Sequence, residues 1–226
     1  MEHVKMRDEF IKTIEGYDSS AKAYSETIVK LSNYDETYDF LADCLKENAS
    51  ILDLACGPAN ISSYLLQHKR LMNITGIDLS QNMIDIAKKN VPQGTFFCAD
   101  VVEYRSKEKY DAAIIGFAIP YLNMQEIETF LSNTEFNLNH GAYLYISFMN
   151  GYKEGYENPS FNQEVELYIH YHQKTSIEQL LKKLNFTIIK QWELDYQESD
   201  GSITTDVILI ARKRDIKMYD VNQDIY

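Results

Sequence analysis

The stretch ILDLACGPANISSYLL, residues 51–66, changes character twice. It starts as a short apolar run, passes through a turn of small residues around Gly57, and continues as a helical pattern that extends to Leu66. This order predicts a buried strand, a tight turn and a helix. In sheets built from alternating strands and helices, nucleotide-like ligands bind at such a turn, because small side chains let the ligand reach the backbone.

Strands and helices alternate along the chain that follows. Apolar runs and amphipathic patterns predict strands over residues 73–78, 94–100, 110–117 and 141–148, and helices over residues 80–90 and 123–136. Ser80 is expected to cap the first of these helices, and Asn123 with Glu126 forms a capping-box pattern at the second. This alternation predicts a parallel sheet covered by helices on both faces.

The alternation ends after the strand at 141–148. Residues 149–163 are irregular, and residues 164–172 have the pattern of an additional strand. Thr175 with Glu178 then forms a capping-box pattern for a further helix.

The last two strand patterns are joined tightly. They cover residues 186–196 and 202–213, and the segment between them contains Asp200 and Gly201, a strong hairpin signal. Two strands joined in this way must run antiparallel. The predicted fold is therefore an α/β, doubly wound, mixed sheet with a reversed strand late in the chain.

The first fifty residues have helical patterns, with apolar side chains recurring at helical spacing in residues 21–31 and 38–45. The chain is accordingly divided into an N-terminal helical cap at 1–48, a main domain at 49–214 with a substrate-side insertion at about 149–175, and a tail at 215–226.

Charge argues against several kinds of partner. The formal net charge is −12, whereas nucleic-acid binding draws most of its affinity from Lys and Arg, so no nucleic acid is expected to bind. The one basic cluster, residues 211–214, is interpreted as the solvated end of a strand. No apolar run is long enough to span a bilayer and the first residues lack a signal-peptide core, so we expect a cytoplasmic protein without a membrane partner. A monomer or homodimer is expected.

Three cysteines, Cys44, Cys56 and Cys98, show neither paired metal-ligand spacing nor the dense pattern of a disulfide framework. We expect no metal ion, and the thiols are interpreted as packing residues.

The turn at Gly57 is a poor phosphate cradle. A dinucleotide's pyrophosphate needs a row of backbone N–H donors and three glycines, but the corresponding positions are Ala55, Gly57 and Ala59. Pro58, directly after the glycine, has no N–H to donate. The turn therefore favours a ligand that approaches the backbone closely without a phosphate.

Three carboxylates are expected at the same edge of the sheet. Asp78 ends the second strand, at the interval after Gly57 where an acidic side chain accepts hydrogen bonds from ribose hydroxyl groups. Asp100 follows the next strand and could accept from an adenine amine, and Asp53 lies near the end of the first strand, close to a cationic amino group. These residues suit a ligand that carries a ribose and a positive charge.

The motifs ILDLACGPAN, GIDLSQNMIDIA, GTFFCAD and YDAAIIGFAIPYL, in this order and at these intervals, resemble the cofactor motifs of class I S-adenosylmethionine-dependent methyltransferases. The resemblance covers roughly residues 20–212. It implies a Rossmann-like, seven-stranded sheet whose last strand is antiparallel, in agreement with the hairpin pattern. It also implies S-adenosyl-L-methionine as cofactor.

The resemblance implies roles for particular residues. The cofactor-binding residues that it implies are Tyr24, Asp53, Ala55, Cys56, Gly57, Asp78, Leu79, Met83, Asp100, Val101, Gly116, Phe117 and Ala118. Among them Asp78 would hold the ribose, Met83 would flank the adenine, and Tyr24 would close over the cofactor. Ala55 and Ala59 depart from the family pattern, in which glycines occupy these positions.

Acceptor-side residues are harder to assign. His170 and His172 alternate along a strand pattern and so lie on one face, where a histidine could act as a general base, and Tyr121 is a further candidate. Packing or surface roles are the alternatives for each histidine. The expected activity is methyl transfer to a nitrogen or oxygen atom of a small molecule by in-line displacement. A non-catalytic cofactor-binding protein and a nicotinamide-dependent oxidoreductase are the alternatives.

Overall fold

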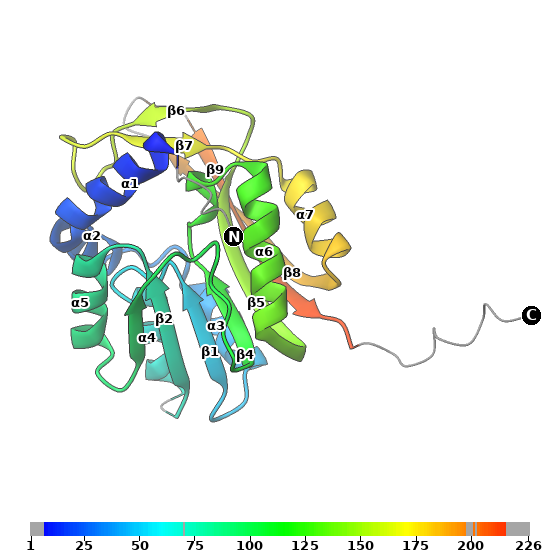
Figure 1. The fold of residues 1–226 in the computed structure, drawn as a ribbon. Helices are drawn as coiled ribbons and strands as arrows, with labels where there is room; N and C mark the ends of the chain where they lie inside the picture. The colour runs from blue at the N-terminus through cyan, green and yellow to red at the C-terminus, as the bar shows by residue number, and fades with distance from the viewer. Residues whose placement is uncertain (1–6, 70, 198–200, 202, 216–226) are drawn as a thin grey trace, which may run out of the picture.

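The computed structural model describes residues 7–69, 71–197, 201 and 203–215. Its centre is a seven-stranded sheet in the order β3-β2-β1-β4-β5-β9-β8 (Figure 1). The strands are β1 (Ser50–Leu54), β2 (Asn73–Asp78), β3 (Thr95–Cys98), β4 (Tyr110–Ile115), β5 (Leu138–Asn150), β8 (Phe186–Gln197) and β9 (Ile203–Lys213).

The strand directions confirm the predicted mixed sheet. β1 pairs in parallel with β2 and β4, and the parallel pairing continues to β3 and β5. β9 lies between β5 and β8 and runs antiparallel to both, so β9 is the reversed strand of the described sheet. Asp200 of the predicted hairpin lies outside the described residues, and Gly201 has φ +85°, a left-handed conformation that hairpin turns require.

Helices cover both faces of the sheet, as the alternation predicted. One face carries α3 (Asp35–Cys44), α4 (Asn60–His68) and α5 (Gln81–Asn90), and the other carries α6 (Met124–Asn137) and α7 (Lys174–Lys183). Successive side chains of β1 point to opposite faces of the sheet. Ile51 therefore packs against α3, α4 and α5, and Leu52 packs against α6 and α7. None of the helices in the described residues is long and apolar enough to cross a membrane.

The predicted starts of α5 and α6 are confirmed. The Ser80 hydroxyl accepts a hydrogen bond from the Met83 backbone N–H at 3.1 Å. At α6 the Asn123 side chain accepts from the Glu126 N–H, and the Glu126 carboxylate accepts from the Asn123 N–H, which completes the capping box.

A cap lies over the carboxyl ends of the parallel strands (Figure 1). It contains α1 (Asp8–Ser19), α2 (Ala21–Ile28), and the antiparallel pair β6 (Glu154–Glu157) and β7 (Leu167–His170). β7 is the predicted extra strand of residues 164–172, shortened at both ends. β6 lies in the segment predicted to be irregular, since four residues with a glycine among them give no clear alternating pattern.

The predicted capping box of α7 is wrong. The helix begins at Lys174, its N-cap is Gln173, and no side chain of the N-cap makes a capping bond. The Lys174 backbone N–H is instead satisfied by the Asn150 side-chain oxygen at 3.1 Å. Thr175 therefore lies inside the first turn, and the cap comes from β5, a partner that local sequence does not reveal.

The basic cluster at residues 211–214 was predicted to be the solvated end of a strand, but it is only partly solvated. Arg212 and Arg214 are exposed, but Lys213 is buried. Its ammonium group donates to the Glu135 and Leu138 carbonyls at 2.7 and 3.0 Å and pairs with the Glu135 carboxylate at 2.8 Å. Lys213 thus satisfies carbonyls at the end of α6.

Candidate functional site

The turn between β1 and α4 is built from residues in left-handed conformations. Ala55, Gly57 and Ala59 have φ values of 56°, 51° and 59°. A residue with a Cβ pays roughly 1–2 kcal/mol for this conformation, so the two alanines that replace glycines are strained. The turn is held by the Cys56 N–H, which donates to the Ile77 carbonyl at 3.0 Å.

Gly57 leaves open space above the turn. A Cβ placed on Gly57 would meet only the Tyr24 ring, at 3.6 Å from its Cε1 atom. Gly116, at the end of β4, differs, since a Cβ there would lie 2.7 Å from Ile61 Cδ1. Gly57 therefore lets another molecule approach the backbone, whereas Gly116 lets α4 pack against β4.

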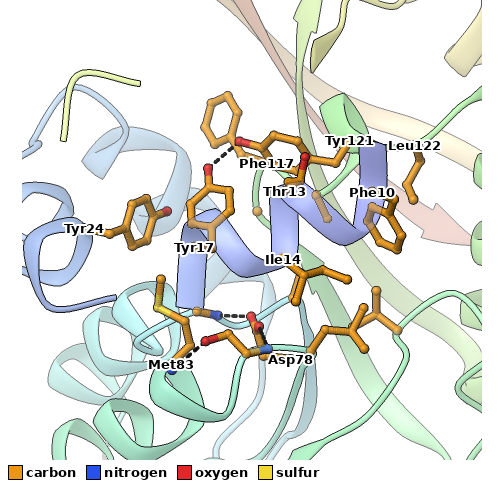
Figure 2. A pocket seen from close by; sticks show the side chains of 17 residues that line it. Phe10, Thr13, Ile14, Tyr17, Tyr24, Asp78, Met83, Phe117, Tyr121 and Leu122 are labelled. Atoms are coloured by element: carbon orange, nitrogen blue, oxygen red, sulfur yellow. Dashed lines mark hydrogen bonds between the residues drawn. The ribbon is translucent and has the colours of Figure 1, made fainter. Parts of the chain in front are cut away.

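Asp78 ties the ends of β1 and β2 together. Its carboxylate accepts hydrogen bonds from the Gly57 N–H at 2.8 Å and the Ser80 N–H at 2.9 Å (Figure 2). Burial raises the pKa of Asp78, and these N–H donors partly oppose the shift. Each carboxylate oxygen keeps capacity for a further donor from the cavity.

Asp53 is almost fully buried beneath the turn. Its carboxylate accepts from the Ser62 hydroxyl at 2.5 Å. Burial raises the pKa of Asp53 to about 7, and the Ser62 hydrogen bond opposes this rise. The side chain is therefore poised between its charged and neutral forms near neutral pH.

A main cavity of about 690 Å³, including its open mouth, lies between the sheet edge and the cap (Figure 2). Its lining residues are Phe10, Thr13, Ile14, Tyr17, Tyr24, Ala55, Gly57, Asp78, Leu79, Ser80, Met83, Val101, Gly116, Phe117, Ala118, Tyr121 and Leu122.

A smaller inner cavity continues from the main cavity past the turn. The two cavities share Tyr24, Ala55, Gly57, Gly116 and Phe117. The inner cavity is further lined by Ile28, Tyr34, Tyr38, Asp53, Cys56, Asn60 and Ile61. A groove that extends along α2 and α4 shares Ile28, Tyr34, Tyr38 and Asn60 with the inner cavity.

The roof of the main cavity is the helix α1, which belongs to the predicted N-terminal helical cap but none of whose residues was predicted to line the site. Phe10, Thr13, Ile14 and Tyr17 line the cavity from this helix (Figure 2). Their spacing places them on one face of a helix, and this spacing was the available signal.

Polar contacts hold α1 at both ends. At its start the Arg7 guanidinium donates to the two Glu126 carboxylate oxygens at 2.9 and 2.8 Å and to the Tyr121 carbonyl at 3.1 Å. At its end the Asp18 carboxylate accepts from the Ser80 hydroxyl at 2.6 Å and from the Asn82 N–H at 3.0 Å. The carboxylate thus lies at the N-terminus of α5, where a negative charge is favourable.

Aromatic side chains from four segments meet beside the roof. The Tyr17 ring lies 5.3 Å from Tyr24, 5.4 Å from Tyr121 and 5.3 Å from Phe161, centroid to centroid. The Tyr17 and Tyr121 hydroxyl groups also share a short hydrogen bond (Figure 2). Burial raises the pKa of Tyr121 to about 12 and also raises the pKa values of Tyr17 and Tyr24, so these phenols stay neutral.

Most of the sequence-predicted residues converge on the two cavities. The main cavity receives Tyr24, Ala55, Gly57, Asp78, Leu79, Met83, Val101, Gly116, Phe117, Ala118 and Tyr121. The inner cavity adds Asp53 and Cys56. Cys56 is buried, which raises the pKa of its thiol, so it is a neutral packing residue in this structure.

Three predicted residues lie outside both cavities. The Asp100 carboxylate accepts from the Val102 N–H at 2.9 Å and so shapes the loop that presents Val101. His172 is buried, and its Nε2 contacts the Leu122 carbonyl at 2.9 Å. His170 stacks on His172 and contacts Glu154 of β6 through Nδ1 at 2.9 Å, which places both histidines on one face as predicted, but His170 is engaged within the cap.

The described residues contain no group of three or more His, Cys, Asp or Glu side chains arranged to hold a metal ion.

Comparison with known proteins identifies the relatives of this chain. Residues 51–141 match the family described as "Methyltransferase domain". A malonyl-[acyl-carrier protein] O-methyltransferase of Priestia megaterium is 27% identical over 141 residues, which are 54% of this chain and 51% of that protein. The chain spans about half of this relative's length and between 22% and 49% of the length of several others.

Two solved structures show the same fold over nearly the whole chain. The structure of a DhpI–SAH complex has a TM-score of 0.69 at 13% identity and covers 93% of this chain and 99% of its own. The N-methyltransferase NodS of Bradyrhizobium japonicum, in complex with S-adenosyl-l-homocysteine, has a TM-score of 0.68 at 14% identity. The match covers 90% of this chain and 100% of the NodS chain. Ordered motifs, sheet topology and these likenesses agree: residues 51–141 match the methyltransferase-domain family, and the chain has the fold of solved S-adenosylmethionine-dependent methyltransferases.

Proposed function

We propose that this protein binds S-adenosylmethionine across the two cavities and transfers its methyl group to a nitrogen or oxygen atom of a small molecule. One observation carries the proposal: the turn at Gly57, the Asp78 carboxylate and Met83 face one cavity at the carboxyl ends of β1 and β2. Ligands of α/β sheets bind at this edge.

The residues present fit the nucleoside part of the cofactor. Asp78 keeps free lone pairs on a buried carboxylate, which suits ribose hydroxyl groups. Leu79, Met83 and Val101 supply apolar walls for the adenine. The open space above Gly57 admits a ligand close to the backbone.

The site fits a dinucleotide poorly. Pro58 removes one N–H donor from the turn, and no Lys, Arg or His is among the described residues that line the two cavities. A pyrophosphate would therefore lack positive partners. The carboxylates of Asp53 and Asp78 instead suit a ligand that carries cationic groups.

The chemistry places few demands on the protein. When bound, the cofactor supplies a methyl group already activated on a sulfonium sulfur. The turn, Asp78 and the end of β4 at Gly116–Ala118 would fix its orientation, and α1 with the aromatic side chains would exclude water.

Other assignments complete the proposal. Within the predicted helical cap at residues 1–48, α1 and α2 would form the acceptor-side cap together with residues at about 149–175, over a methyltransferase domain at residues 49–214. Tyr24 would close over the cofactor. With a net charge of −12, we expect no nucleic-acid partner, and we propose a cytoplasmic monomer or homodimer.

Calorimetric titration tests the proposal. S-adenosylmethionine and S-adenosylhomocysteine should bind the wild-type protein, while NADH should not. Asp78→Ala should weaken binding about tenfold or more, because it removes the ribose acceptor and a tie to the turn. Asp85→Ala, which removes an exposed carboxylate of α5, is the matched control and should bind like the wild type.

Two outcomes would overturn this account. Tight NADH binding in place of S-adenosylmethionine would indicate an oxidoreductase. Binding of the cofactor without S-adenosylhomocysteine formation across amine, hydroxyl and carboxylate acceptors would indicate a non-catalytic binding protein.

A further inference from the structure

We infer that the methyl acceptor is an amine, and that the hydroxyl groups of Tyr17 and Tyr121 position its nitrogen. This inference rests on the proposed function and narrows it to one class of acceptor. Three features of the cavities carry it: their charges, the state of their titratable groups, and the free hydrogen-bonding capacity of the tyrosine pair.

The charges disfavour an anionic acceptor. The charged side chains among the described residues that line the main and inner cavities are Asp53 and Asp78, both carboxylates. The Arg7 guanidinium lies just outside the main cavity, but the Glu126 carboxylate accepts two hydrogen bonds from it. A carboxylate acceptor would therefore enter without a cation to offset the loss of its hydration.

The titratable groups disfavour a hydroxyl acceptor. An alcohol or phenol must lose its proton as it attacks, so it needs a base within hydrogen-bond reach. The cavity phenols remain protonated at neutral pH because burial raises their pKa values. Asp53 is 2% exposed and accepts from Ser62, and Asp78 accepts from two backbone N–H groups, so neither carboxylate is free to move toward an acceptor.

An amine avoids both difficulties. It reaches its neutral, nucleophilic form by exchanging a proton with water before it binds, so the protein need not supply a base. The cationic product that results from methyl transfer suits aromatic walls and nearby carboxylates.

The hydroxyl groups of Tyr17 and Tyr121 have capacity to hold such an amine. Each phenol can donate one hydrogen bond and accept two, and their mutual bond uses one donor and one lone pair. The pair therefore keeps one O–H proton and several lone pairs on atoms that border the main cavity (Figure 2). Phenol oxygens that accept from the N–H groups leave the nitrogen lone pair free to face the methyl group.

The proposed step balances. The amine nitrogen uses its lone pair to form the new N–C bond, while the electron pair of the breaking C–S bond stays with sulfur. The product is an ammonium ion, which gives up its extra proton to water after release.

The experiment uses matched probes of nearly equal shape: 2-phenylethylamine, 2-phenylethanol and 3-phenylpropanoate. Binding of each probe to the protein saturated with S-adenosylhomocysteine is measured by calorimetry, and methylation by mass spectrometry with S-adenosylmethionine present. The N,N,N-trimethylated amine serves as a product mimic. The amine or its trimethylated form should bind about tenfold or more tightly than the other two probes.

Variants separate positioning from folding. Tyr17→Phe and Tyr121→Phe keep the rings, so S-adenosylhomocysteine affinity should be unchanged while amine affinity falls several-fold. Tyr152→Phe, on a side chain that is 86% exposed, is the control and should change neither.

The outcomes distinguish the inference from the proposed function. Failure of S-adenosylhomocysteine to bind would reject the proposed function itself. Binding of S-adenosylhomocysteine with equal or tighter binding of the alcohol or the carboxylate, or with no amine binding at millimolar concentration, would overturn only the amine assignment. Amine binding unaffected by either tyrosine variant would overturn the role of the pair.

Discussion

Removing the Arg7 guanidinium should loosen α1 and speed the release of ligand from the main cavity. Arg7 makes two hydrogen bonds to Glu126 and one to the Tyr121 carbonyl, and the paired side chains are only 27% and 25% exposed. Charge-assisted hydrogen bonds contribute more than neutral ones, and partial exposure reduces their value. For Arg7→Ala we therefore expect a loss of about 1–2 kcal/mol, which is a factor of about 5–30 in the open population of α1.

The assay is the dissociation rate of S-adenosylhomocysteine, measured by stopped-flow fluorescence, together with hydrogen exchange of the α1 amides. Arg7→Ala should raise the dissociation rate about tenfold and should raise exchange in α1 while exchange in β1 and β4 is unchanged. Lys12→Ala removes an exposed cation from the same helix and is the matched control. Equal dissociation rates for Arg7→Ala, Lys12→Ala and the wild type would refute the role of α1 as a roof.

Three further predictions concern stability, and urea unfolding measures each of them. Burial raises the pKa of Asp53 in the folded state to about 7, so between about pH 4 and pH 7 the folded state holds a proton that the unfolded state has lost. The free energy of unfolding should therefore be highest below about pH 4, with respect to this group, and should fall as the pH rises to about 7. Asp53→Asn should remove this loss, and an equal pH dependence in the two proteins would contradict the assignment. Ala59→Gly removes a left-handed alanine and should leave the free energy of unfolding unchanged or raise it by up to about 1 kcal/mol. The control Ala87→Gly, inside α5, should lower it by about 1 kcal/mol or more. A clear loss of stability in Ala59→Gly would be inconsistent with strain in the turn. Lys213→Ala should cost about 1–3 kcal/mol because it removes buried hydrogen bonds and the ion pair with Glu135, and a cost no larger than that of exposed Arg212→Ala would show that the buried contacts contribute little.

Local patterns predicted the sheet well because its strands and several helix starts are determined by residues that lie close together in the sequence. The central parallel strands β1 and β4 are apolar runs, since both of their faces are buried. Ser80 and Asn123 cap helices through bonds that span only a few residues. The reversed strand followed from a tight connection, which geometry forces to be antiparallel.

The failures share a different cause, because the deciding partner lies far away in the sequence. The start of α7 is capped by Asn150 from β5, and the buried Lys213 donates to carbonyls where α6 ends and β5 begins. The same distance hid the residues of α1 that line the cavity, although a helical cap was predicted there, since the anchor Arg7 pairs with Glu126. Tyr121 lines the main cavity, as expected. His170 instead contacts Glu154, and His172 contacts the Leu122 carbonyl.

A crystal structure with S-adenosylhomocysteine tests the central claim most directly. We expect the ribose hydroxyl groups within hydrogen-bond distance of the Asp78 carboxylate and the adenine beside Met83. A ligand bound elsewhere on the molecule, or a ribose that makes no contact with Asp78, would contradict the account.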